Sequence, residues 1–156
     1  HLADGFSAHV CVLRPASRGS VTLVSTNPRV APAIDMGFLS DPRDLQSLLA
    51  GARLAETMLQ SPELAPWRGQ RLYPHDGSDA GLQEAIRAHA DTIYHPVGTC
   101  RMGSDRDAVT SPDLRVRGVQ NLRVVDASVM PRLIGGNTNA PTIMLAERAA
   151  DLISHG

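Results

Sequence analysis

Aromatic side chains are scarce in this chain of 156 residues, which has one Trp, two Tyr and two Phe. Any hydrophobic core must therefore be built mainly from Leu, Val, Ile, Ala and Met. The formal net charge is only −1, so the basic face of a general nucleic-acid-binding protein is not expected. No apolar run reaches the ~18 residues of a membrane-spanning helix. The composition is that of a globular protein with a core of ordinary size.

Cysteine is also rare, and the two present, Cys11 and Cys100, are too few for a disulfide framework. No group of His, Cys and Asp has the spacing of a zinc site, so no metal is expected. Two reduced thiols are typical of the cytoplasm, which is the compartment we predict, and no signal peptide is visible. The start, at His1, is no natural initiator, and strand-like sequence follows almost at once, so we expect a piece of a longer protein.

The first half of the chain predicts strands followed by two helices. Strands are expected at 10–14, 19–25 and 33–36, with a turn at 15–19. Asp41 is expected to cap a helix that begins at Pro42 and ends before Ser61, with Asp44 in its first turn favoured by the helix dipole. After an irregular connection over 62–78, Ser78 is expected to cap the second helix.

The second half consists mainly of loops. The apolar run 122–125 predicts a short buried strand that ends at Asp126. A Gly- and Asn-rich loop follows over 135–139, and Pro141 opens a last helix. The residues of that helix expected to face the core are Ile143, Ala146, Ala150 and Ile153.

Common catalytic motifs are absent from the sequence. It contains no G-x-S-x-G elbow, no Walker loop and no G-x-G-x-x-G dinucleotide fingerprint. The spacing of Ser128, Asp126 and His95 gives no support to a hydrolytic triad. A strand that ends in an acid near a helix N-terminus is a plausible place for a cofactor, although this pattern alone is a weak signal.

Several ordered blocks resemble the C-terminal region of the glucose–methanol–choline oxidoreductases, and the resemblance covers nearly the whole chain. They are His95-Pro96-Val97-Gly98-Thr99-Cys100-Arg101-Met102-Gly103, the run from Leu122 to Pro131, and Gly136-Asn137-Thr138-Asn139-Ala140-Pro141-Thr142-Ile143-Met144 with the helix that follows. Upstream matches are Arg14-Pro15 with Ser17-Arg18-Gly19, and Phe38 to Asp44. Within the family the sequence is most similar to choline dehydrogenase-like members.

The resemblance implies a role for particular residues. His95 matches the catalytic histidine beside the flavin, and Asn137 matches the second catalytic position. Cofactor contacts are implied for Asp126, Ala127, Asn139, Pro141 and Thr142. The implied reaction is hydride transfer from a primary alcohol to FAD with His95 as the base. Full proton transfer from an alcohol of pKa ~15.7 to an ordinary imidazole of pKa ~6.5 would cost roughly 12 kcal/mol, so the base needs help from a donor such as the Asn137 amide or from coupled hydride departure.

The fold class implied is α+β, with a mostly antiparallel sheet backed by helices. Residues 1–94 would form part of a substrate-binding domain, and residues 95–156 would return to an FAD-binding domain whose N-terminal Rossmann portion is absent. We therefore expect the isolated chain to be inactive and to bind little or no FAD. Its implied partners are an alcohol, the N-terminal FAD-binding portion of the same protein and, as a possibility, further copies in a homo-oligomer. Two alternatives stay open, a flavin-containing hydroxynitrile lyase-like member and a separate non-catalytic domain.

Overall fold

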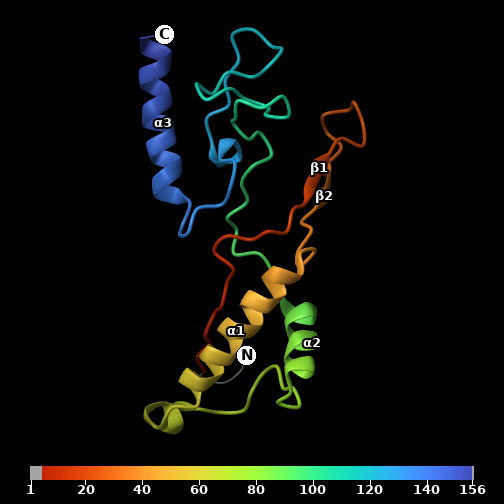
Figure 1. Ribbon diagram of the computed structural model, residues 1–156, viewed down its shortest axis with the longest axis vertical. Coiled ribbons are helices and arrows are strands. Elements are labelled where there is room, and N and C mark those ends of the chain that lie inside the picture. The colour runs from red at the N-terminus through yellow and green to blue at the C-terminus, as the bar shows by residue number, and fades with distance from the viewer. Residues whose placement is uncertain (1–4, 156) are drawn as a thin grey trace. The chain divides into compact units, whose positions relative to one another are not determined.

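The computed structural model describes residues 5–155, which form two compact units (Figure 1). One unit contains residues 5–19 and 35–91, and the other contains residues 20–34 and 92–155. Helices and a small antiparallel sheet are both present, so the predicted α+β class is confirmed. Within the described residues, no helix is both long and apolar enough to cross a membrane.

The first unit is built on two helices that lie side by side, α1 (Pro42–Leu59) and α2 (Asp79–His89) (Figure 1). Both predicted caps are confirmed. The Asp41 carboxylate accepts a hydrogen bond from the backbone N–H of Arg43 at 3.0 Å, and the Ser78 hydroxyl accepts one from Gly81 at 3.0 Å. A short 3-10 helix, η1 (Pro62–Trp67), lies in the connection that was predicted to be irregular.

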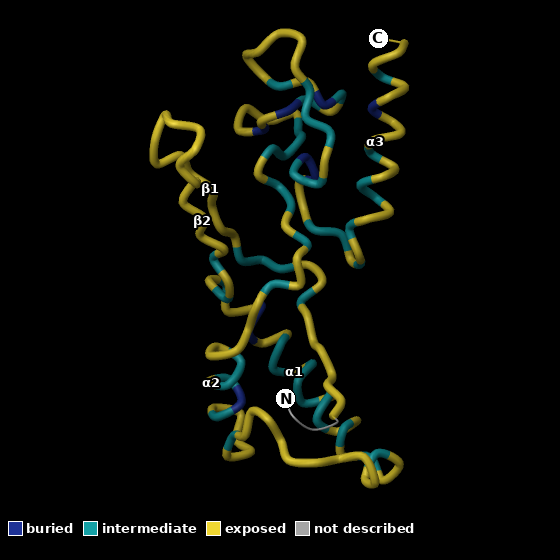
Figure 2. Tube along the Cα trace, turned by 180° about the vertical axis from the view of Figure 1, so that it is seen from behind, coloured by how far each residue is buried: buried dark blue, intermediate teal, exposed yellow. Residues whose placement is uncertain are grey.

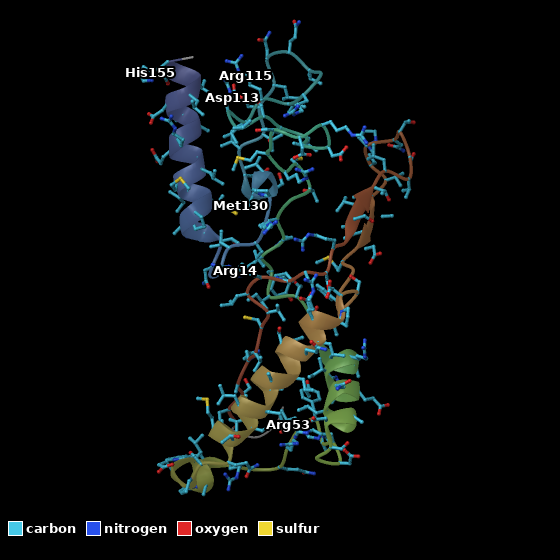
Figure 3. The ribbon with its side chains drawn as sticks, viewed as in Figure 1. Arg14, Arg53, Asp113, Arg115, Met130 and His155 are labelled. Carbon is cyan, nitrogen blue, oxygen red and sulfur yellow. The ribbon has the colours of Figure 1, made fainter. Side chains whose placement is uncertain are left out.

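Polar side chains tie α1 to the segment that leads into α2. Arg53, on α1 (Figure 3), donates to the Asp79 carboxylate at 2.6 Å and to the Gly77 carbonyl at 3.0 Å. The His75 ring accepts the Gly77 N–H through Nδ1 at 3.0 Å, and its Nε2 lies 2.6 Å from the Glu56 carboxylate and 2.7 Å from Nη1 of Arg71. Because the ring of His75 is only 5% exposed, this contact is shielded from water.

Asp44 has a larger role than the predicted contribution to the helix dipole. Its carboxylate is buried and accepts the backbone N–H groups of Ala16 at 2.9 Å and Ser17 at 2.8 Å. The Ser17 hydroxyl in turn accepts the backbone N–H of Asp41 at 3.0 Å. These bonds fix the 15–19 turn against the first turn of α1.

The sheet consists of β1 (Ser20–Thr22) and β2 (Ala33–Asp35), and every residue of both strands is exposed (Figure 2). The strand predicted at 33–36 is confirmed over 33–35, and that at 19–25 is confirmed over 20–22 alone. The strand predicted at 10–14 is wrong. Residues 13 and 14 form a bend instead, and after the 15–19 turn the chain pairs through β1 with β2. Gly37 makes this approach possible, since its φ is 59° and a Cβ there would lie 2.1 Å from the Arg18 carbonyl oxygen.

The core of the second unit is small and is formed by loops and one helix. Leu114, Val129 and Ala149 are buried together (Figure 2), and the apolar side chains packed on them are Met102, Val124, Val125 and Leu145. Two regular elements contribute to this core, the 3-10 helix η2 (Ala127–Val129) and α3 (Asn139–Ser154).

The predicted strand at 122–125 is wrong. This segment makes one isolated bridge, between Arg115 and Arg123. Its two backbone bonds to the loop run from Val116 to the Leu122 carbonyl at 2.9 Å and from Val124 to the Leu114 carbonyl at 3.1 Å. A strand needs continuous partners for its N–H and C=O groups, and within residues 5–155 this run pairs with an irregular loop instead.

The prediction of which face of α3 is buried is also wrong. Ile143 and Ile153 are 54% and 56% exposed, whereas Ala149 is 1% exposed and packs in the core. The helix has two apolar stripes, and periodicity alone does not determine which one packs. It also begins at Asn139, two residues before Pro141, which lies in its first turn.

Candidate active site

All seven residues predicted for the site lie in the second unit, in two loops and at one helix end. His95 is half-buried in a segment without regular secondary structure. Two residues with positive φ flank it, Tyr94 at 64° and Gly98 at 95°. A bulky residue rarely adopts this conformation, so surrounding contacts must hold the backbone here.

Those contacts come from the turn that follows Asp126. The Ser128 carbonyl oxygen accepts the N–H groups of both Gly98 and Cys100 at 3.0 Å, and the Val129 carbonyl accepts that of Met102 at 2.8 Å. Gly98 also lies against Met130 (Figure 3), because a Cβ at Gly98 would be 3.5 Å from the Met130 carbonyl oxygen. The loop that carries His95 is thus laid directly on the Asp126 turn.

Asp126 is exposed and caps η2. One oxygen of its carboxylate, Oδ1, accepts the Ser128 N–H at 2.8 Å and also the Ser128 hydroxyl. Ala127, between them, is half-buried. Sequence reasoning missed Ser128, although an Asp two residues before a Ser is the pattern of an Asx turn and could have indicated it.

The remaining predicted residues surround the N-terminus of α3. Asn137 and Asn139 are exposed, while Pro141 and Thr142 are half-buried. Thr138 is the N-cap residue, but its side chain makes no capping bond. The Thr142 hydroxyl donates to the Thr138 carbonyl at 2.7 Å, so its proton is used within the helix. The start of α3 therefore offers backbone N–H groups and the positive end of its dipole to a ligand.

The loop after Cys100 is fixed by its own ion pair. Arg101 binds Asp105 through two bonds of 2.9 and 2.7 Å, and the hydrogen bond from Arg101 is the main reason that the pKa of Asp105 lies well below its ordinary value. Thr110 is fully buried, and its hydroxyl donates to the Cys100 carbonyl at 3.3 Å. A second ion pair, Asp113 with Arg115 at 2.9 Å (Figure 3), lies farther along the same loop.

Hydrogen bonds within the described residues join some of the predicted site segments and leave others apart. Within residues 5–155, no group of three or more His, Cys, Asp or Glu side chains is arranged to hold a metal ion. The hydrogen bonds join the His95 loop to the Asp126 turn. The N–H and the hydroxyl of Thr142 both donate to the Thr138 carbonyl, so these bonds stay within the start of α3.

Comparison with known proteins identifies the family. The C-terminal sequence profile described as GMC oxidoreductase matches residues 15–146, which include every predicted site residue. The chain belongs to the GMC oxidoreductase family. The predicted resemblance is therefore confirmed. Among the solved structures similar to this chain is an FAD-dependent oxidoreductase from Chaetomium thermophilum, with a TM-score of 0.84 at 32% identity over 91% of this chain and 25% of that one.

Individual GMC relatives are similar over almost the whole chain. "Alcohol dehydrogenase [acceptor]" of Pseudomonas putida is 48% identical over 96% of this chain and 27% of its own length. An oxygen-dependent choline dehydrogenase of Pseudomonas syringae pv. tomato is 46% identical, with the same coverage. The crystal structure of pyridoxine 4-oxidase from "Mesorbium loti" superposes with a TM-score of 0.86 at 36% identity, over 92% of this chain and 28% of that one. The chain thus spans about a quarter of the length of the relatives it matches.

Proposed function

We propose that this chain is the C-terminal part of an FAD-dependent alcohol oxidoreductase similar to choline dehydrogenase, and that His95 takes the hydroxyl proton of a primary alcohol. The observation that carries the proposal is the attachment of the His95 loop to the Asp126 turn. Two segments 31 positions apart in the sequence, one with a potential base and one with a potential cofactor contact, share a single hydrogen-bonded turn.

The residues fit a flavin dinucleotide. Asp126 is exposed, and the turn uses only Oδ1 of its carboxylate, so the other oxygen is available to a hydroxyl group of the cofactor. The next residue, Ala127, has only a methyl side chain and is half-buried. The start of α3 presents the N–H groups of its first two residues, Asn139 and Ala140, which suit an electron-rich ring edge. Pro141 has no N–H, and that of Thr142 donates to the Thr138 carbonyl at 3.0 Å. When bound, FAD supplies the acceptor for the hydride of the alcohol.

Within this arrangement, the protein residues move the proton and stabilise charge. His95 accepts the proton from the alcohol oxygen, which raises the electron density on that oxygen as the hydride leaves. The exposed Asn137 amide donates a hydrogen bond to the oxygen and stabilises the developing charge. A positioned base contributes about 10²–10⁴-fold to such a step.

The exposed apolar surface fits the proposal that the N-terminal FAD-binding portion of the same protein is the partner. On α3, Ile143, Met144 and Ile153 are each more than half exposed, and so are Leu23 and Ile34 of the hairpin region. Large exposed apolar residues in such number are typical of an interface.

Two further proposals concern the domain and the compartment. Residues 1–94 belong to a substrate-binding domain. The protein works in the cytoplasm, since Cys11 and Cys100 are both free thiols.

The experiment compares His95→Ala with the wild type in the protein expressed together with the coding sequence upstream of this chain. Rapid mixing with a primary alcohol should bleach the flavin of the wild type, as in an oxidoreductase and not in a lyase. His95→Ala should reduce its flavin about 10²–10⁴-fold more slowly while keeping the flavin bound. The matched control is His89→Ala, because His89 is an exposed histidine of α2 in the other unit. A wild-type rate of reduction in His95→Ala would remove His95 from the mechanism.

A further inference from the structure

We propose that Ser128 is a positioning residue for His95 and couples the occupancy of the cofactor site at Asp126 to the conformation of the His95 loop. The inference rests on the proposed function, in which Asp126 contacts FAD and His95 is the base. It adds Ser128 to that site. Neither the sequence motifs nor the related proteins assign a role to this residue.

Ser128 is bonded on two sides. Toward Asp126, its N–H donates to Oδ1 at 2.8 Å and its hydroxyl donates to the same oxygen. Toward the His95 loop, its carbonyl oxygen accepts the N–H groups of Gly98 and Cys100, both at 3.0 Å. The peptide group that presents this carbonyl is also held through the Val129 N–H, which donates to the Asp126 carbonyl at 3.2 Å, and the hydroxyl bond holds the Ser128 side chain against the same residue.

The His95 loop depends on this support because it has no regular structure of its own. Tyr94 and Gly98 both have positive φ, and the bonds to Ser128 lie only three and five residues beyond His95. If the carbonyl of Ser128 turns, Gly98 and Cys100 lose their acceptor together, and the imidazole of His95 moves with its backbone. A displacement of about 1 Å at a reacting group costs roughly 10²-fold in rate, so a small turn of this peptide is sufficient to matter.

The arrangement also works in the reverse direction. A ligand that binds Asp126 restricts the carboxylate, and the two bonds from Ser128 transmit this restriction to the loop. Coupling between two sites is reciprocal, so a loop held in its bound form also favours the ligand at Asp126. Bound FAD should therefore protect the amides of Gly98 and Cys100 from exchange, although neither residue has a predicted cofactor contact.

The test uses amide hydrogen exchange, with and without FAD, on the full-length protein carrying Ser128→Ala. Without the hydroxyl, the amides of Gly98 and Cys100 should exchange about tenfold faster, the effect of one charge-assisted hydrogen bond. The protection that FAD gives them should shrink. Flavin reduction at saturating alcohol should slow about tenfold with KM and flavin content nearly unchanged. Ser128→Thr keeps a hydroxyl and should restore both measurements to within about twofold of the wild type.

Ser104→Ala is the matched control, because Ser104 is an exposed serine in the loop after Met102. Exchange at Gly98 and Cys100 that is the same in Ser128→Ala and Ser104→Ala overturns the proposal. If Ser128→Ala loses its flavin, exchange is compared between the flavin-free variant and the flavin-free wild type. The amides of Gly98 and Cys100 must still exchange faster in the variant. Failure of the proposed function would give a different result, a wild-type rate of flavin reduction in His95→Ala.

Discussion

Replacing Asp44 by alanine is expected to destabilise the first unit by about 3 kcal/mol. The side chain is 5% exposed and accepts two backbone N–H groups, those of Ala16 and Ser17, at 2.9 and 2.8 Å. A hydrogen bond to a charged group contributes about 1.5–3 kcal/mol, and a buried donor left without its partner costs a similar amount. Taking the lower figure for each bond gives about 3 kcal/mol, a large part of the 5–15 kcal/mol typical of a domain.

The effect should depend on pH with a definite sign. Burial of Asp44 raises its pKa, but the hydrogen bonds from Ser17 and Ala16 together outweigh burial and leave the pKa below its ordinary value of 3.8. A carboxyl group whose pKa is lower in the folded state stabilises that state above the unfolded pKa. The contribution should therefore be complete above about pH 5 and decline as the pH falls below 3.8 and through the lower folded-state pKa.

The measurement is urea unfolding followed by helical circular dichroism at pH 7 and at pH 3, for the wild type and Asp44→Ala. Glu84→Ala is the control, since Glu84 is an exposed carboxylate on α2 and its removal should change stability by less than about 0.5 kcal/mol. An unfolding free energy of Asp44→Ala within 0.5 kcal/mol of the wild type at pH 7 would refute the reasoning. So would a difference that grows on acidification.

Two further predictions concern the cofactor. The purified chain of 156 residues, without additional sequence, should show no stoichiometric flavin absorbance in the visible range and no oxidation of alcohols. A yellow protein with one flavin per chain would contradict this. In the full-length protein, Asn137→Ala should slow flavin reduction by an amount typical of a lost oxyanion donor, roughly 2.7–4 kcal/mol, with flavin content unchanged. Asn139→Ala should instead weaken flavin retention, and the opposite pattern would mean that the roles assigned in this loop are two residues out of register.

Local signals determined the helices of the first unit. Asp41 with Pro42, and Ser78 four residues before Leu82, carry the N-terminal pattern of a helix within a few adjacent residues. The structure has both caps because such bonds depend only on neighbouring backbone groups. Family membership was also readable from the sequence, because the three motif blocks are contiguous and each retains its order.

Other features depended on contacts between distant residues, and the sequence could not supply them. The apolar run at 122–125 resembles a buried strand, but strand formation depends on which backbone lies beside it, and only Arg123 forms a bridge. Asp44 was assigned to the helix dipole because its partners, Ala16 and Ser17, lie 28 and 27 positions away.

By itself, the sequence determined the family, the helix starts of the first unit and the identity of the residues proposed for catalysis and cofactor binding. Tertiary structure alone decided which apolar stripe of α3 packs, since Leu145 with Ala149 and Ala146 with Ala150 have the same i, i+4 spacing. It also decided that Ser128 joins the His95 loop to the Asp126 turn. A carbonyl oxygen carries no sequence signature, so its acceptance of the Gly98 and Cys100 N–H groups appears only when the two loops are folded together.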